Sequence, residues 1–277
     1  MTPRNLKYAA AWALALGLLG GPSQAQTPPL PTRPIVLFGE VHDNAAQHAL
    51  RLAAFESLLT SGARPALLLE QFDRERQGAI DQARAGVPPP DAAQIILAGS
   101  GAPASDTRLW NWPFYEPLIA LALRYGLPIV AANVSREDAR RVIADGLGAH
   151  GFEPQVAPEI QRAQSEAIEA SHCGMLSAAQ AQRMASAQVA RDQFMARLVE
   201  AQAPRGVLLL AGNGHVRTDI GVPRWLTAAT RAKTESIGML EAEGPESEGE
   251  RAEAERAFDR VLVTPAQTRK DPCAAAP

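Results

Sequence analysis

The chain has 277 residues, of which 46% are hydrophobic and 21% are charged, and its formal net charge is −3. This composition supports a full hydrophobic core and excludes an intrinsically disordered chain. A slightly acidic chain without a basic block is also unsuited to nucleic acid or to an anionic membrane surface, so we expect neither as a partner.

Residues 1–25 predict an export signal. Arg4 and Lys7 form a short basic start, residues 8–20 are almost wholly apolar, and small residues precede a cleavage point after Ala25. The alternative is an uncleaved N-terminal anchor, but the apolar run is short for a span of the bilayer. No cysteine follows the run, so we expect no lipid attachment there and no membrane span once the signal is removed.

Beyond the signal, a proline-rich linker over residues 26–34 leads into a single domain over residues 35–277. Four short, unbroken apolar runs predict strands that are buried on both faces: residues 35–38, 66–69, 128–132 and 207–211. Between the first two runs, residues 47–59 have a helical period whose predicted buried face carries Leu50, Ala53, Ala54 and Leu58. The order strand, helix, strand predicts an α/β fold with a mostly parallel central sheet flanked by helices.

Other segments depart from this alternation. Residues 74–113 predict short helices and loops that form a helical insertion over the sheet edge, and residues 136–199 predict several further helices. Residues 236–241 and 258–264 are expected to form a final strand pair. Their connection, residues 241–256, is acidic and holds seven glutamates. We predict that this connection is solvated and mobile because it has little apolar area to bury.

Cys173 and Cys273 are the two cysteines of the chain. In an exported protein an even pair predicts one disulfide. The alternative is a pair of free, buried thiols, and the spacing does not match a zinc-ribbon pattern.

Polar residues follow the predicted strands at the point where each strand ends. Gly39-Glu40-Val41-His42 follows the first strand and Gly212-Asn213-Gly214-His215 follows the fourth, so both strands are left through a Gly-x-x-His turn. Glu70 ends the second strand, and Asn133, followed by Arg136, ends the third. Because ligands bind beyond the carboxyl ends of the strands in an open parallel sheet, we expect one site on which both imidazoles converge.

Imidazole and carboxylate groups at one place support two kinds of chemistry. They suit a divalent transition metal, for which the expected ligands are His42, His215, Glu40 and Glu70. They also suit acid–base catalysis without a metal, with candidate catalytic residues Glu40, Glu70 and Arg136. The sequence has no Gly-x-Ser-x-Gly elbow, so we do not expect a serine hydrolase.

Each of these residues also has a purely structural interpretation. His42 could cap the following helix, although Asp43 or Asn44 would serve as well. Glu70 could pair with an arginine, and His48 could be an ordinary surface or core histidine. An aromatic cluster could pack in the core rather than form a cofactor wall: Trp110, Trp112, Phe114 and Tyr115.

The segment Gly39-Glu40-Val41-His42-Asp43-Asn44, with His48 behind it, resembles the opening motif of the ChaN-like haem-binding uptake proteins of bacteria. These belong to a wider Tiki/TraB group marked by paired Gly-x-x-His motifs. The resemblance continues in order through Leu69-Glu70-Gln71-Phe72, Ala131-Ala132-Asn133 with Arg136, His172-Cys173-Gly174, Arg191-Asp192 with Met195-Ala196, and Gly212 to Arg217. It spans about residues 35–264.

The resemblance implies a haem- or iron-binding protein that takes part in iron or haem uptake, with haem as the cofactor and a homodimer as the assembly. Without a lipoprotein cysteine, the chain is expected to be free in the periplasm or secreted. Tiki relatives are metal-dependent proteases and erythromycin esterase-like relatives are hydrolases. The alternative is therefore a metal-dependent hydrolase of peptides or esters, with a divalent transition metal ion as its cofactor.

Haem ligation in this family is expected to use tyrosine, and only Tyr115 and Tyr125 remain after the signal. Tyr115, beside two tryptophans, is the expected iron ligand. The haem-binding set expected from the resemblance is His42, His48, Tyr115 and His215. If neither tyrosine is available to iron, a histidine would have to take its place.

Overall fold

The computed structural model describes residues 31–86, 88–98, 110–242, 252, 255–269 and 273–274. The predicted export signal and most of the acidic connection lie outside these residues, as do residues 99–109 of the expected insertion. In the described part of the chain, no helix is both long enough and apolar enough to cross a membrane.

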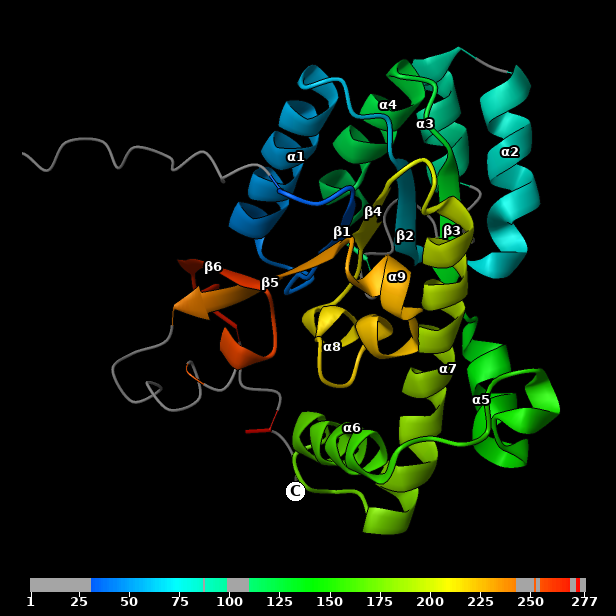
Figure 1. The fold of residues 1–277 in the computed structure, drawn as a ribbon, viewed down its shortest axis with the longest axis vertical. Helices are drawn as coiled ribbons and strands as arrows, with labels where there is room; N and C mark the ends of the chain where they lie inside the picture. Colours follow the sequence, from blue (N-terminus) through cyan, green and yellow to red (C-terminus); the bar gives the residue numbers. More distant parts are fainter. Residues whose placement is uncertain are drawn as a thin grey trace, which may run out of the picture.

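Within these residues, a sheet of six strands forms the centre of the fold, in the order β3-β2-β4-β1-β5-β6 (Figure 1). Its strands are β1 (Ile35–Phe38), β2 (Ala66–Asp73), β3 (Ile129–Asn133), β4 (Val207–Leu210), β5 (Thr234–Ala242) and β6 (Arg260–Pro265). Every pairing between them is parallel, including that of β5 with β6. The predicted α/β fold is confirmed, and β1 and β4, which precede the two Gly-x-x-His turns, are neighbours in the sheet.

Helices cover both faces of the sheet (Figure 1). One face carries α1 (Ala45–Thr60), α2 (Gln77–Gly86), α3 (Pro89–Ala98) and α4 (Glu116–Arg124), and the other carries α7 (Ala178–Gln202). Successive strand residues point to opposite faces. Val36 and Phe38 therefore pack in the first layer, whereas Ile35 and Leu37 pack in the second.

A third group of helices extends past the carboxyl edge of the sheet. There α5 (Arg136–Asp145) and α6 (Pro158–Ser171) pack with α7 around an apolar cluster that includes Val142, Ile160 and Val189 (Figure 1). The remaining short elements are η1 (Arg74–Arg76), η2 (Trp112–Phe114), η3 (Gly148–His150), α8 (Asn213–Val216), η4 (Val222–Trp225) and α9 (Ala228–Arg231).

The start and the buried face of α1 are set by polar residues. Asn44 is the N-cap, because its side chain accepts a hydrogen bond from the backbone N–H of Gln47 at 3.2 Å. Of the predicted apolar face, Ala54 is fully buried, and Leu50 and Leu58 are partly buried and pack against the core. The residues that the helix buries are Gln47, His48, Arg51, Ala54, Phe55 and Leu59.

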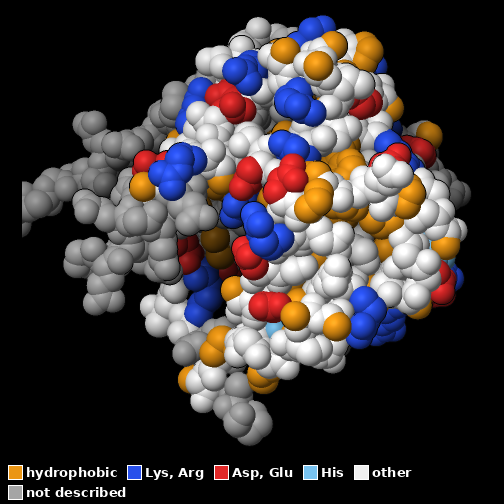
Figure 2. Space-filling view, turned by 60° about the horizontal axis from the view of Figure 1, so that its bottom comes forward, with side chains coloured by type: hydrophobic (Ala, Val, Ile, Leu, Met, Phe, Trp, Pro, Cys, Tyr) orange, Lys and Arg blue, Asp and Glu red, His pale blue; other side chains and the backbone are white. Residues whose placement is uncertain are grey.

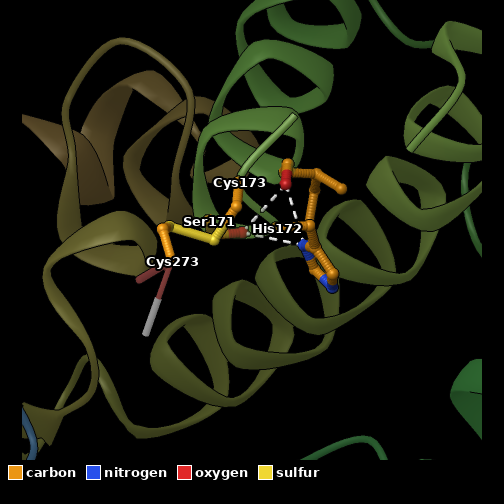
Figure 3. The surroundings of a disulfide bond; sticks show 5 residues. Ser171, His172, Cys173 and Cys273 are labelled. Atoms are coloured by element: carbon orange, nitrogen blue, oxygen red, sulfur yellow. Dashed lines mark hydrogen bonds between the residues drawn. A yellow bond between two sulfur atoms is a disulfide. The ribbon is translucent and has the colours of Figure 1, made fainter. Parts of the chain in front are cut away.

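A disulfide joins Cys173, just after α6, to Cys273 near the end of the chain (Figure 3). Their Cα atoms lie 5.5 Å apart, and the predicted pairing is confirmed. The bond ties the segment after β6 to the helices beyond the sheet edge. Arg269 anchors the same segment through ion pairs with Asp43 and Glu241, both at 2.5 Å.

Candidate functional site

A cavity of about 770 Å³ opens at the carboxyl edge of the sheet. Its first wall consists of residues at the carboxyl ends of β1, β2, β3 and β4 or just beyond them. Its second wall consists of residues from α6 and α7. Its size is in the ordinary range for a small-molecule or cofactor site. The residues predicted to bind a divalent metal or to act in catalysis all line it: Glu40, His42, Glu70, Arg136 and His215.

Glycine is needed in both Gly-x-x-His turns because other groups approach the backbone closely. A Cβ atom on Gly39 would lie 2.2 Å from Oδ1 of Asn213, so the first turn could not pack on the second. A Cβ atom on Gly212 would lie 3.1 Å from Cε1 of His42. The second turn therefore leaves room for the imidazole of the first.

His42 is held by one ring nitrogen and presents the other. Its Nδ1 lies 2.5 Å from Oε1 of Glu40, so Nδ1–H donates to that carboxylate. Trp110 contacts the ring edge to face, with 4.7 Å between centroids. The His42 side chain is 44% exposed, and its Nε2 makes no hydrogen bond to the described residues. A carboxylate on one nitrogen and a free second nitrogen are typical of a histidine that binds a metal centre.

Glu40 is itself fixed by buried partners. Its carboxylate forms an ion pair with Arg51, and it accepts hydrogen bonds from the Tyr115 hydroxyl at 2.5 Å and from Nε2 of Gln71 at 3.3 Å. Burial opposes its charge, but Arg51 and His42 hold the pKa of the Glu40 carboxyl below its usual range. The carboxylate therefore stays ionised and keeps His42 in one orientation.

Tyr115 and His48 lie behind the cavity wall and do not line it. Tyr115 is fully buried, and burial together with Glu40 raises the pKa of its hydroxyl. The nearly buried His48 donates from Nε2 to the carbonyl of His42 at 2.9 Å and accepts at Nδ1 from Arg51. In these positions both residues support the Glu40–His42 pair. Tyr125 contacts Arg64 at the C-terminal end of α4, away from the cavity lining.

The neutral state of His48 predicts a pH dependence of stability. Burial and the charge of Arg51 lower the pKa of His48 to about 4. Between that pH and an unfolded-state pKa of about 6.5, the unfolded chain binds a proton that the folded chain does not. The free energy of unfolding should therefore fall by about 3 kcal/mol as the pH falls through this window, and His48→Gln should remove that part of the slope.

Urea unfolding of the wild type and of His48→Gln, measured from about pH 4 to about pH 8, tests this expectation. Above about pH 7 the difference between the two proteins should be constant, which serves as the internal control. Parallel curves over the whole range would contradict the assignment of a neutral, buried His48.

The second Gly-x-x-His histidine is part of a different cluster. Nδ1 of His215 lies 2.6 Å from Oδ1 of Asp192, and its Nε2 lies 3.3 Å from Oε1 of Glu70. Burial alone would lower the pKa of His215, but the two carboxylates raise it to about 10. The ring is therefore a buried imidazolium between two acids, with no free nitrogen to offer.

The four residues predicted as ligands of a divalent metal thus lie around one cavity in two hydrogen-bonded pairs. Glu70 also accepts a hydrogen bond from the backbone N–H of Gly212 at 2.7 Å. Among the described residues, no group of three or more His, Cys, Asp or Glu side chains is arranged to hold a metal ion.

The cavity is also lined by two arginines and by two residues that have unpaired polar atoms in the described structure. Arg191 and Arg136 both line it. Nε1 of Trp112 and Oε1 of Gln71 are buried in the wall without a hydrogen-bond partner among the described residues. Buried polar atoms are nearly always paired, so these atoms are expected to meet a ligand or water. Figure 2 shows acidic and basic side chains interspersed over the face it displays.

Several residues of the site were not found by sequence reasoning. Asp192 and Arg191 belong to a motif of the family resemblance, but their place on a long helix gives no indication of a role. Arg51 lies one turn after His48 on the same helical face, and that spacing could have indicated a shared polar contact. Gln71 directly follows Glu70, and alternation along a strand predicts that the two side chains point to opposite faces.

The fold and the cavity together define an α/β protein with a ligand site at the carboxyl edge of a parallel sheet. A family model described as haem-binding uptake, Tiki superfamily, ChaN matches residues 29–226. The chain therefore belongs to this family of haem-binding uptake proteins. Among curated proteins, none matches the chain.

The chain is similar to several solved structures. A structure described as cofacial haem binding to ChaN of Campylobacter jejuni has a TM-score of 0.60 and 20% identity, over 76% of this chain and 82% of that chain. An erythromycin esterase, EreC, has a TM-score of 0.45 and 14% identity, over 76% and 70%. A Bacillus cereus protein has a TM-score of 0.42 and 14% identity, over 76% and 66%. The likeness to ChaN supports the α/β fold described above.

Proposed function

We propose that this chain binds haem in the cavity at the carboxyl edge of its sheet, with Nε2 of His42 as the iron ligand. The observation that carries the proposal is the geometry of His42. Its Nδ1 is fixed by Glu40 at 2.5 Å, whereas its Nε2 has no partner in the described structure. Imidazole is a common axial ligand of haem iron, and a carboxylate on the second nitrogen increases its basicity.

The other residues of the cavity suit haem as well. Trp110 provides aromatic surface, Ala167 and Ile168 provide further apolar area from α6, and Trp112 contributes an edge, since it is only 3% exposed. Haem needs such surface for its porphyrin ring and a polar region for its two carboxylates. The tyrosine ligation expected from the family resemblance is less well supported, because the hydroxyl of Tyr115 is buried and donates to Glu40. We therefore propose that Tyr115 and His48 position the Glu40–His42 pair and that His215 forms part of the cavity wall.

We further propose that the protein works outside the cytoplasm in the uptake or handling of haem or iron. Family membership, the Cys173–Cys273 disulfide and the apolar N-terminal run of the sequence support this location. A homodimer that shares haem between its subunits also belongs to this proposal. The ratio of haem to protein and the mass of the complex in solution would test it.

The alternative, a metal-dependent hydrolase with a divalent metal on His42, His215, Glu40 and Glu70, has weaker support. Both nitrogens of His215 already face carboxylates, and Glu40 is already engaged by Arg51 and Tyr115. Binding a metal on this set would require several of these buried contacts to break, which is costly.

A pair of titrations separates the two functions. We expect ferric haem to bind the purified protein saturably, with a Soret band distinct from that of free haem, because His42 offers an imidazole to the iron. A zinc titration of the protein, measured by calorimetry under the same conditions, should show no saturable binding that depends on His42 and His215. Stoichiometric zinc binding with zinc-dependent turnover of a peptide or ester, and no saturable haem binding, would contradict the proposal.

A further inference from the structure

Two cationic side chains of the cavity lack an acidic partner. Within the described part of the chain, Arg136 makes no hydrogen bond or ion pair, and no carboxylate lies within ion-pair distance of Arg191. Arg191 instead donates from Nε to Oδ1 of Asn133 at 3.2 Å and from Nη1 to Oε1 of Gln188 at 3.3 Å. These amides orient the guanidinium without neutralising it.

Both arginines face the same space, although they come from different elements. Arg136 is the first residue of α5, and Arg191 lies on α7, which packs against α5. Asn133, at the end of β3, also lines the cavity and accepts a hydrogen bond from Arg191. Two like charges at one cavity repel each other, so their arrangement favours a ligand that brings negative charge.

The acids nearest to Arg191 form no direct ion pair with it. Glu70 and Asp192 both hold the imidazolium of His215, at 3.3 Å and 2.6 Å. Asp73 also lines the cavity, and no ion pair joins it to either arginine in the described structure. In the described structure no carboxylate is therefore hydrogen-bonded or ion-paired to either guanidinium, although acids lie nearby.

We infer that Arg136 and Arg191 form a carboxylate-binding subsite that recognises the propionates of haem. The inference rests on the proposed haem-binding function. Guanidinium groups bind carboxylates through paired, charge-assisted hydrogen bonds, and a planar donor held by amides loses little freedom on binding. The subsite fixes the orientation of the porphyrin in the cavity, while His42 engages the iron. It also selects haem over porphyrins without acidic side chains.

The test compares ferric haem with its dimethyl ester, in which both propionates are blocked, in wild type and in the double variant Arg136→Gln, Arg191→Gln. Wild type should bind haem about tenfold or more tightly than the ester, because hydrogen bonds to charged groups are lost with the ester. The affinity of the double variant for haem should fall by a similar factor, whereas its affinity for the ester should stay within about twofold of the wild-type value. Arg140→Gln is the matched control, since Arg140 lies on the same helix but outside the cavity lining.

Retained ester binding shows that the variant is folded and that its site is intact. Equal wild-type affinity for haem and ester would overturn the inference, and so would an equal loss of both ligands in the double variant. A preference for haem that persists in the double variant would overturn it too. Each of these three results would leave the proposed haem-binding function intact. If the wild type binds neither ligand, the proposed function fails.

Discussion

Replacement of Cys173 and Cys273 by serine is expected to lower the free energy of unfolding by about 4 to 5 kcal/mol. The disulfide closes a loop with a sequence separation of 100 residues, and in the chain-entropy model a loop of this length restricts the unfolded chain strongly. The bond also ties the C-terminal segment to the end of α6, whose Ile168 and Ser171 line the cavity. Loss of the disulfide removes the covalent link between the C-terminal segment and the end of α6.

Urea unfolding of the oxidised wild type, the reduced wild type and the double serine variant measures this effect. The reduced wild type and the variant should unfold at similar urea concentrations, and reductant should leave the variant unchanged. A loss below about 1 kcal/mol would contradict the expectation and would place the stabilising contacts of the C-terminal segment elsewhere, for example at Arg269.

Four strands of the fold could be predicted because each is a short, unbroken run of apolar residues. Unbroken apolar runs such as Val207–Leu210 are too short for a typical helix and are buried on both faces, as strands are in a sheet covered on both sides. The turns that follow them could be predicted for the same reason. A glycine and a polar residue directly after a buried strand place the polar group at the carboxyl edge, where Glu40 and His42 lie.

The contacts within the site could not be predicted from spacing. Besides the expected apolar residues, α1 buries Arg51 and His48, because Arg51 pairs with the carboxylate of Glu40 on another element. The expectation for Tyr115 depended on its neighbours in sequence, whereas its hydroxyl is directed by Glu40, which is 75 residues away. Long-range polar pairs leave no periodic pattern in the sequence.

His42→Gly should remove most of the haem affinity, a loss on the order of a hundredfold, and should change the Soret band of any haem that still binds. The physical reason is that the variant lacks the only imidazole whose second nitrogen is free toward the cavity within the described structure. Glycine leaves space beside Gly212 where a small ligand can enter. His150→Gly is the matched control, because His150 pairs with Asp145 and does not line the cavity.

The most direct test of iron ligation by His42 is a haem titration of His42→Gly with and without added imidazole. The proposed site predicts that imidazole restores the wild-type Soret band and most of the lost affinity, because free imidazole occupies the space left by the side chain. Imidazole should have little effect on the haem complex of His150→Gly. A His42→Gly protein that binds haem with the affinity and spectrum of the wild type, without imidazole, would contradict the assignment.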